Sequence, residues 1–124
     1  MKLTSDEFAT LVQRALADIP ERFAEYLRDL TVDVEPLPDR RTCREMGIDD
    51  PEELLGLYHG TPLTERSVEQ SLQLPDRITL YQRNIESVCE TEEEIIDEIR
   101  LTVLHEVGHH FGLDEDDLDE LGYG

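Results

Sequence analysis

Apolar residues recur at helical spacing near the beginning of the chain. They form one face of a helix, whose members are Phe8, Leu11, Val12, Ala15, Leu16 and Ile19. Thr4 and Glu7 precede this face with the spacing of a capping box. The pattern predicts an amphipathic helix of about four turns. We expect a second helix to begin at Pro20, a residue favoured in the first turn, and to reach Leu30.

Three later segments have the composition of strands. "TVDVEPLP" (31–38) alternates valines with acids and ends in prolines, "LLGLYHG" (54–60) is a short apolar run, and "RITLYQRNIE" (77–86) is rich in β-branched and aromatic residues. Between them we expect a loop over 37–50, a short helix or turn at Pro51, and an irregular connection over 61–76.

The last long pattern is helical again. Thr91 and Glu94 form another capping box, and apolar residues follow at helical spacing from Ile95 to Phe111. Gly112 is placed to end this helix in a left-handed cap, and a short helix is expected over 115–121. Helices around a small strand cluster predict an α+β fold, and the length is that of a single domain, residues 1–124.

The net charge of the chain limits the classes of partner that it can bind. It has 31 acidic and 11 basic residues, a formal net charge of -20. This charge argues against nucleic acid and against anionic membranes as partners, and it permits metal ions or basic peptides. A plain solvated acidic surface is the alternative. There is no apolar run long enough to span a bilayer, and "MKLTSDEF" does not read as a signal peptide, so we expect a cytoplasmic protein. Cys43 and Cys89 are expected to be free thiols.

The sequence His105-Glu106-Val107-Gly108-His109 has the pattern H-E-x-x-H. On a helix, His105, Glu106 and His109 share one sector about 100° wide, beside the apolar stripe. Two imidazoles one turn apart can bind one Zn²⁺, and the glutamate can take a proton from a metal-bound water. The alternative is a cluster of surface histidines without a metal. His110 points nearer the apolar stripe and is interpreted as a packing or supporting residue.

Zinc requires a third protein ligand. In one branch of zincins it follows a glycine turn, in the pattern H-E-x-x-H-x-x-G-x-x-H. The same frame here places Glu115 where that branch has a third histidine, after Gly112. Asp114 is the rival, although it could instead cap the final helix. The later acids are interpreted as a solvated face.

The segment "HEVGHHFGLDED" resembles the small bacterial zincin-like metallopeptidase family, whose pattern is H-E-x-x-H-x-x-G-x-x-[DE]. The resemblance extends to "LLGLYHGTPLTERS" and "PDRITLYQRNIE". It implies a zincin-like α+β fold, a zinc site and peptidase activity. It carries over to His105, Glu106, His109 and Glu115, where the common family residue at the last position is Asp.

These observations lead to a zinc peptidase acting on short or unfolded peptides. Zincins receive substrate along an edge strand, and we expect residues 77–86 to form that edge, with Tyr81 and Arg83 on one face binding the peptide. His59 could line the cleft and donate to an oxyanion. Two alternatives remain: a metal-binding protein of the same fold that acts by interaction without catalysis, and a structural acidic partner of basic proteins.

Overall fold

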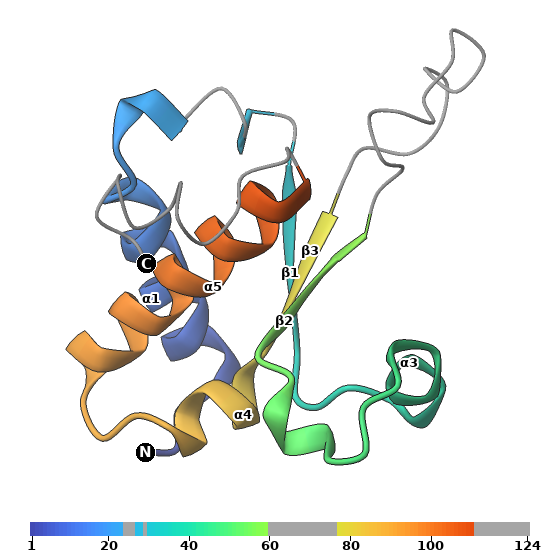
Figure 1. Cartoon of the computed structure of the whole chain (residues 1–124). Coiled ribbons are helices and arrows are strands. Elements are labelled where there is room, and N and C mark those ends of the chain that lie inside the picture. The colour runs from blue at the N-terminus through green and yellow to red at the C-terminus, as the bar shows by residue number, and fades with distance from the viewer. Residues whose placement is uncertain (24–26, 29, 60–76, 111–124) are drawn as a thin grey trace, which may run out of the picture.

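The protein folds into a small sheet covered on one face by helices. This computed structural model describes residues 1–23, 27–28, 30–59 and 77–110. Helices α1 (Ser5–Ala17) and α5 (Glu92–His110) lie together on the same side of the sheet (Figure 1). The α+β class predicted from the sequence is therefore confirmed.

In the described residues the sheet has three strands, in the order β1-β3-β2. β1 (Thr31–Glu35) runs parallel to β3 (Arg77–Tyr81), and β2 (Gly56–His59) runs antiparallel to it. β3, the last of these three strands in sequence, is thus the central one, with both of its edges paired. β1 and β2 form the two outer edges of the sheet in the part of the chain that is described.

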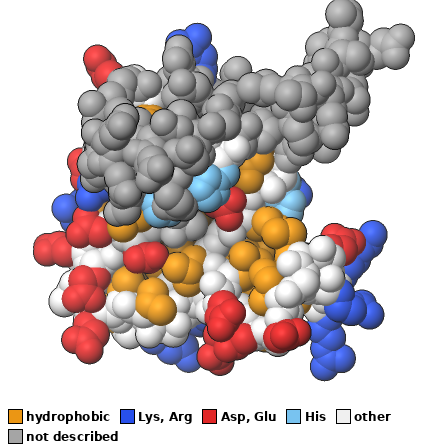
Figure 2. All heavy atoms as spheres, viewed as in Figure 1, with side chains coloured by type: hydrophobic (Ala, Val, Ile, Leu, Met, Phe, Trp, Pro, Cys, Tyr) orange, Lys and Arg blue, Asp and Glu red, His pale blue; other side chains and the backbone are white. Residues whose placement is uncertain are grey.

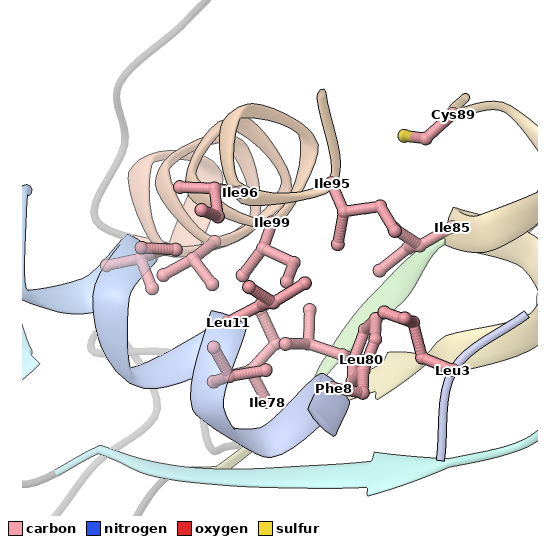
Figure 3. Packing of buried hydrophobic residues seen from close by; sticks show 14 residues of the cluster. Leu3, Phe8, Leu11, Ile78, Leu80, Ile85, Cys89, Ile95, Ile96 and Ile99 are labelled. Carbon is pink, nitrogen blue, oxygen red and sulfur yellow. The ribbon is translucent and has the colours of Figure 1, made fainter. Parts of the chain in front are cut away.

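The core lies between the sheet and the two long helices (Figure 3). The side chains of Phe8, Ile78, Leu80, Ile99 and Val103 are fully inaccessible to solvent. Strand alternation explains the sheet's contribution, because Ile78 and Leu80 point to the face that the helices cover. Burial of this apolar surface supplies most of the favourable free energy of folding.

Both capping boxes predicted from the sequence contribute hydrogen bonds. The backbone N–H of Glu7 donates to Thr4 Oγ1 at 3.1 Å, and that of Thr4 donates to Glu7 Oε1 at 2.9 Å. At the start of α5 the N–H of Glu94 donates to Thr91 Oγ1 at 3.1 Å. The Glu94 carboxylate accepts from the N–H of Glu90 rather than from that of Thr91, which is one residue outside the usual pairing.

Two expectations from the sequence are wrong. Residues 37–50 are not all loop, because α3 (Arg40–Met46) forms between an Asp39 N-cap and Gly47, whose φ of 67° ends the helix. The strand expected over 77–86 ends at Tyr81, and α4 (Gln82–Ser87) follows at once. The reasons are taken up in the Discussion.

Other expectations agree with the structure or fall outside it. The short helix at Pro51 is the 3₁₀ helix η2 (Pro51–Glu53), and both cysteines are free and buried. The expected helix from Pro20 begins with the 3₁₀ helix η1 (Glu21–Phe23), and its continuation is described only in part. The connection over 61–76, Gly112 and the helix over 115–121 lie outside the described residues.

The helices of residues 1–23, 27–28, 30–59 and 77–110 include none that is long and apolar enough to cross a membrane. The cytoplasmic location and the single domain expected from the sequence stay predictions.

Candidate metal centre

The H-E-x-x-H residues lie in the last turns of α5. Val103, Leu104 and Val107 are buried, His105 and Glu106 are half-buried, and His109 is exposed. The two neighbouring sectors predicted for this helix, one apolar and one carrying the motif, are therefore present. The side chain of His110 is outside what the structure describes.

The rings of His105 and His109 are neighbours. Their centroids are 6.3 Å apart and their planes make an angle of 29°. A Zn²⁺ ion binds an imidazole nitrogen at about 2.0–2.1 Å, so rings at this separation are close enough for one ion to be held between them. This donor pair fits zinc, which accepts neutral imidazoles readily.

Glu106 lies in a less polar environment than a surface carboxylate. Burial raises the pKa of Glu106 above its ordinary value, while the nearby His109 and His105 act in the opposite direction. A carboxyl group with a raised pKa is a better proton acceptor than a fully hydrated one. The position is suited to a general base.

A pocket of about 300 Å³ opens beside these residues. One wall is the segment 53–56, which leads into β2, and the other wall is the α5 surface formed by Glu98, Leu101, Thr102, His105 and Glu106. Figure 2 shows histidine side chains gathered near acidic and hydrophobic side chains on this face of the molecule. The half-buried histidine and the glutamate of the motif therefore border a space that a ligand can enter.

Gly56 brings the two walls of the pocket together. A Cβ atom added at Gly56 would lie 2.7 Å from Cγ2 of Thr102 and 3.2 Å from the carbonyl oxygen of Thr79. Only glycine allows α5 to approach β2 this closely. Thr102 is one turn before His105 and Glu106, so this contact sets the distance between the motif and the edge of the sheet.

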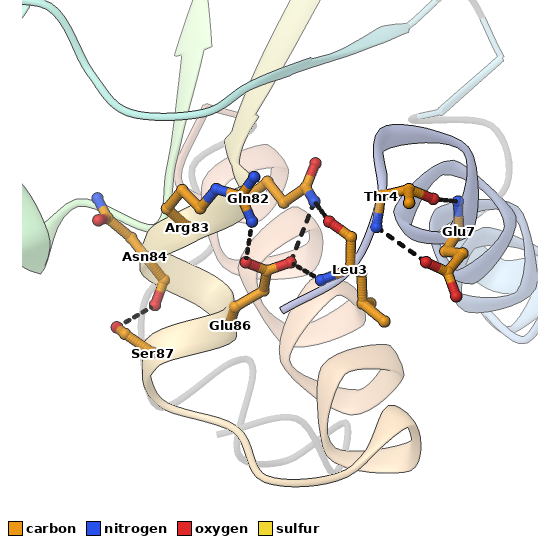
Figure 4. A network of polar contacts seen from close by, with 8 residues as sticks. All are labelled: Leu3, Thr4, Glu7, Gln82, Arg83, Asn84, Glu86 and Ser87. Atoms are coloured by element: carbon orange, nitrogen blue, oxygen red, sulfur yellow. Dashed lines mark hydrogen bonds and ion pairs between the residues drawn. The ribbon is translucent and has the colours of Figure 1, made fainter. Parts of the chain in front are cut away.

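Asn84 holds the wall formed by 53–56. It is 1% exposed, and its Nδ2 donates to the carbonyl oxygens of Pro51 and Leu54, both at 2.7 Å. On the same helix, Gln82 and Glu86 bind the backbone of Leu3 instead (Figure 4). One short helix thus fixes both the beginning of the chain and the segment that enters the pocket.

The geometry expected for Tyr81 and Arg83 is wrong. β3 is the central strand and cannot accept a further strand. Tyr81 is 4% exposed, and its N–H donates to the carbonyl oxygen of Leu55 at 3.0 Å. Arg83 belongs to α4, where its guanidinium donates to Glu86 at 2.8 Å. Alternation along one strand therefore does not relate these two residues, and their role in substrate binding stays a prediction without this support.

His59 lies on the face of the sheet away from α5. Gly56 faces Thr102 of α5, so strand alternation turns Tyr58 toward the helices and His59 to the opposite face. Burial lowers the pKa of His59, Arg77 lowers it further, and Asp33 opposes them. These neighbours belong to the outer face of the sheet. A role for His59 in binding an oxyanion beside the motif therefore stays a prediction without support from this geometry.

The expected third ligand, Glu115, and its rival Asp114 lie outside the described residues. Within residues 1–23, 27–28, 30–59 and 77–110 there is no group of three or more His, Cys, Asp or Glu side chains that could hold a metal ion. The described residues therefore supply two candidate ligands, His105 and His109, and one candidate base, Glu106.

Comparison with known families decides the relationship. The zincin-like metallopeptidase family model matches residues 27–124. The chain belongs to this family. The match covers β1, the pocket walls and the whole of α5, and it agrees with the resemblance drawn from the H-E-x-x-H segment.

The zincin-like fold is also found in a solved structure. A conserved hypothetical protein from Thermus thermophilus is similar over 96% of this chain and 97% of its own, with 26% identity and a TM-score of 0.54. Comparison with curated proteins finds no match. The likeness supports the fold of this zincin-like protein and supplies no activity.

Several residues of this zincin-like site were not predicted from the sequence. Glu53, Glu98 and Thr102 line the pocket, and Asn84 supports its wall. Helical spacing is the signal that could have found two of them, since Glu98 and Thr102 lie seven and three residues before His105 and therefore on the same side of α5. Glu53 and Asn84 gave no local signal.

Proposed function

We propose that this protein is a zinc-dependent peptidase that hydrolyses bonds in short or unfolded peptides. The observation that carries the proposal is the half-buried Glu106 beside a stacked pair of histidines at the border of a pocket. Family membership supports the reaction class.

Each residue of the motif has a role in this proposal. His105 and His109 hold the ion, and Glu115 is the proposed third ligand. When bound, zinc polarises a peptide carbonyl and lowers the pKa of water to about 7. Glu106 accepts the proton of the attacking water and donates it to the leaving amine.

The edge of β2 replaces β3 as the proposed position of the substrate. Because the carbonyl of Leu55 accepts from the N–H of Tyr81, Leu55 and Leu57 turn their backbone groups toward β3. The N–H and C=O groups of Gly56 then point away from β3. An extended peptide could pair with them next to the pocket.

A second candidate is a metal-binding protein of the same fold without catalytic activity. The size of the pocket favours it, because about 300 Å³ is at the lower end of the range for ligand sites. Its action would then be an interaction with a peptide or protein rather than hydrolysis.

Metal content and peptide digestion test the proposal together. Wild type should bind about one Zn²⁺, and His105→Ala or His109→Ala should abolish binding, because each variant loses a direct ligand. Glu106→Gln should retain zinc and lose hydrolysis, since the amide keeps the size of the side chain without the base. Equal zinc content in wild type and both histidine variants would exclude the metal centre.

The outcome with wild type separates the two candidates. If zinc-loaded wild type cleaves no member of a diverse peptide library, the non-catalytic candidate is correct. If Glu106→Gln cleaves as fast as wild type, the assigned role of Glu106 is wrong.

The third ligand requires its own comparison. Glu115→Ala should weaken zinc affinity by about tenfold or more, given that losing a residue that only supports a ligand already costs about 10–100-fold. Asp116→Ala and Asp117→Ala should change the affinity little. Asp114→Ala should cost about 0.5–2 kcal/mol of stability through loss of a cap. Loss of zinc in Asp114→Ala alone would assign the ligand to Asp114.

A further inference from the structure

The pocket beside the motif combines acidic and apolar groups in a way that selects a particular side chain. Among the described residues, its walls carry three carboxylates, those of Glu53, Glu98 and Glu106, and no lysine or arginine. Leu54, Leu55 and Leu101 are half-buried and supply apolar surface between them. Such a lining fits a group that is apolar along its length and cationic at its end.

Two basic residues on α5 and the neighbouring α4 have other partners. Arg100 on α5 pairs with Asp97 at 2.6 Å and with Asp18 at 4.0 Å. Arg83 on α4 pairs with Glu86 at 2.8 Å. No ion pair joins Glu53 or Glu98 to a basic side chain in the described part of the chain, so their charges are open to a ligand.

We propose that this pocket recognises a lysine or arginine side chain of the bound peptide, with Glu53 and Glu98 as the residues that determine the specificity. The proposal rests on the proposed function for its effect on hydrolysis, and it names the substrate class of that site. The methylene stem contacts the leucines, and the cationic head reaches the two carboxylates at opposite walls. A volume of about 300 Å³ accommodates a single side chain of this kind.

The pocket differs from the general acidity of the protein. The net charge of -20 attracts every cation, but salt screens exposed charges beyond about 8–10 Å. Glu98 is half-buried and Glu53 is exposed, and both border the pocket. A cationic head held between them would be in direct contact, a range at which salt screens the attraction least. Specificity should therefore depend on Glu53 and Glu98 and remain at physiological salt.

Blocked peptides test this directly. In each peptide of a series, acetylated at the N-terminus and amidated at the C-terminus, one arginine occupies a different position. A matched series carries neutral citrulline, which has nearly the same shape. Binding to the full zinc-loaded chain is measured by calorimetry at about 0.15 M salt, the physiological ionic strength, and kcat/KM is measured in parallel. The blocked ends exclude recognition of a terminal ammonium.

We expect arginine at one position to bind about tenfold more tightly than citrulline, the size expected of a charge-assisted hydrogen bond. Glu98→Gln and Glu53→Gln should each remove most of this preference. Glu93→Gln is the control, because Glu93 lies on α5, is exposed and is not part of the pocket. It should keep the preference while removing the same charge.

Two results would overturn the proposal: equal binding of arginine and citrulline at every position, or equal losses in Glu93→Gln, Glu98→Gln and Glu53→Gln. The test separates this proposal from the peptidase. Selective binding that depends on Glu98 without any cleavage would refute hydrolysis and retain the specificity. Cleavage without a preference for a basic residue would support hydrolysis and refute the proposed specificity.

Discussion

Replacing Gly56 by alanine would place a methyl group 2.7 Å from Cγ2 of Thr102 and 3.2 Å from the carbonyl oxygen of Thr79. The first distance is far below a van der Waals contact, so β2 and α5 must move apart. Overpacking of this kind costs about 1–3 kcal/mol. At about 4 °C per kcal/mol for a domain of this size, Tm should fall by about 4–12 °C.

A second substitution identifies the cause. Thr102→Ser removes the Cγ2 atom that the new methyl group would meet, and by itself should cost at most about 1 kcal/mol. The double variant should be more stable than the sum of the single effects predicts. Urea unfolding of the four proteins gives the coupling free energy directly.

Gly47→Ala is the matched control. Gly47 has φ of 67° and open space where its Cβ would be, so alanine there should cost about 1–2 kcal/mol through backbone strain. Thr102→Ser should not rescue it. If Gly56→Ala and Thr102→Ser are simply additive, the close approach of α5 to β2 is not what glycine permits at this position.

The remaining predictions concern the polar side chains of α4 and a buried thiol. Asn84→Ala should leave the carbonyls of Pro51 and Leu54 without their donor, cost about 1–3 kcal/mol, and speed hydrogen exchange of the amides over 53–57. Gln82→Ala removes another buried amide of the same helix and should destabilise the protein without this local effect. Burial raises the pKa of Glu86, but hydrogen bonds from Gln82, Leu3 and Arg83 lower it more, so its folded value lies below the ordinary 4.5. Its stabilising contribution is therefore present above about pH 4.5 and is lost as pH falls through the folded value, and Glu86→Gln should flatten the acid limb of the stability curve; an unchanged limb would contradict the assignment. Burial, followed by the nearby Glu98 and Glu94, raises the pKa of Cys89 to about 11, so alkylation at about pH 8 should be much slower in native than in unfolded protein, as mass spectrometry of the modified peptide would show.

The parts of the fold that depend on local signals could be predicted. Thr4 with Glu7 and Thr91 with Glu94 mark the starts of α1 and α5, because capping acts between residues three apart. The layout of His105, Glu106 and His109 also follows from helical periodicity alone. The α+β class followed from the predicted helices and strands together, and the family followed from the resemblance of the H-E-x-x-H segment.

The missed helices lack an amphipathic pattern or depend on distant partners. α3 has a capping aspartate and a glycine stop, but Cys43 is its only buried side chain, so no amphipathic pattern marks it. α4 begins at Gln82, and its N-cap residue Tyr81 makes no side-chain cap hydrogen bond. It is held instead by contacts from Leu3 and from the segment 51–54, which local sequence does not reveal.

The pocket wall formed by residues 53–56 could not be predicted either, because it also depends on contacts between distant parts of the chain. Its position depends on the order of the strands, and residues 77–86 were expected at the edge where β2 lies. A strand in the centre and a strand at the edge have similar compositions when each packs one face against helices. Only the pairing of β2 with β3 shows which one borders α5.

The central position of β3 has a consequence for how the chain folds. Within the described sheet, residues 31–35 and 56–59 pair only with residues 77–81, which come later in the chain. Leu3 must likewise wait for Glu86, 83 residues later in the chain. Such distant pairings favour slow folding. During synthesis the first two strands would leave the ribosome before their shared partner, and their apolar faces would be exposed to aggregation or to chaperones in that interval.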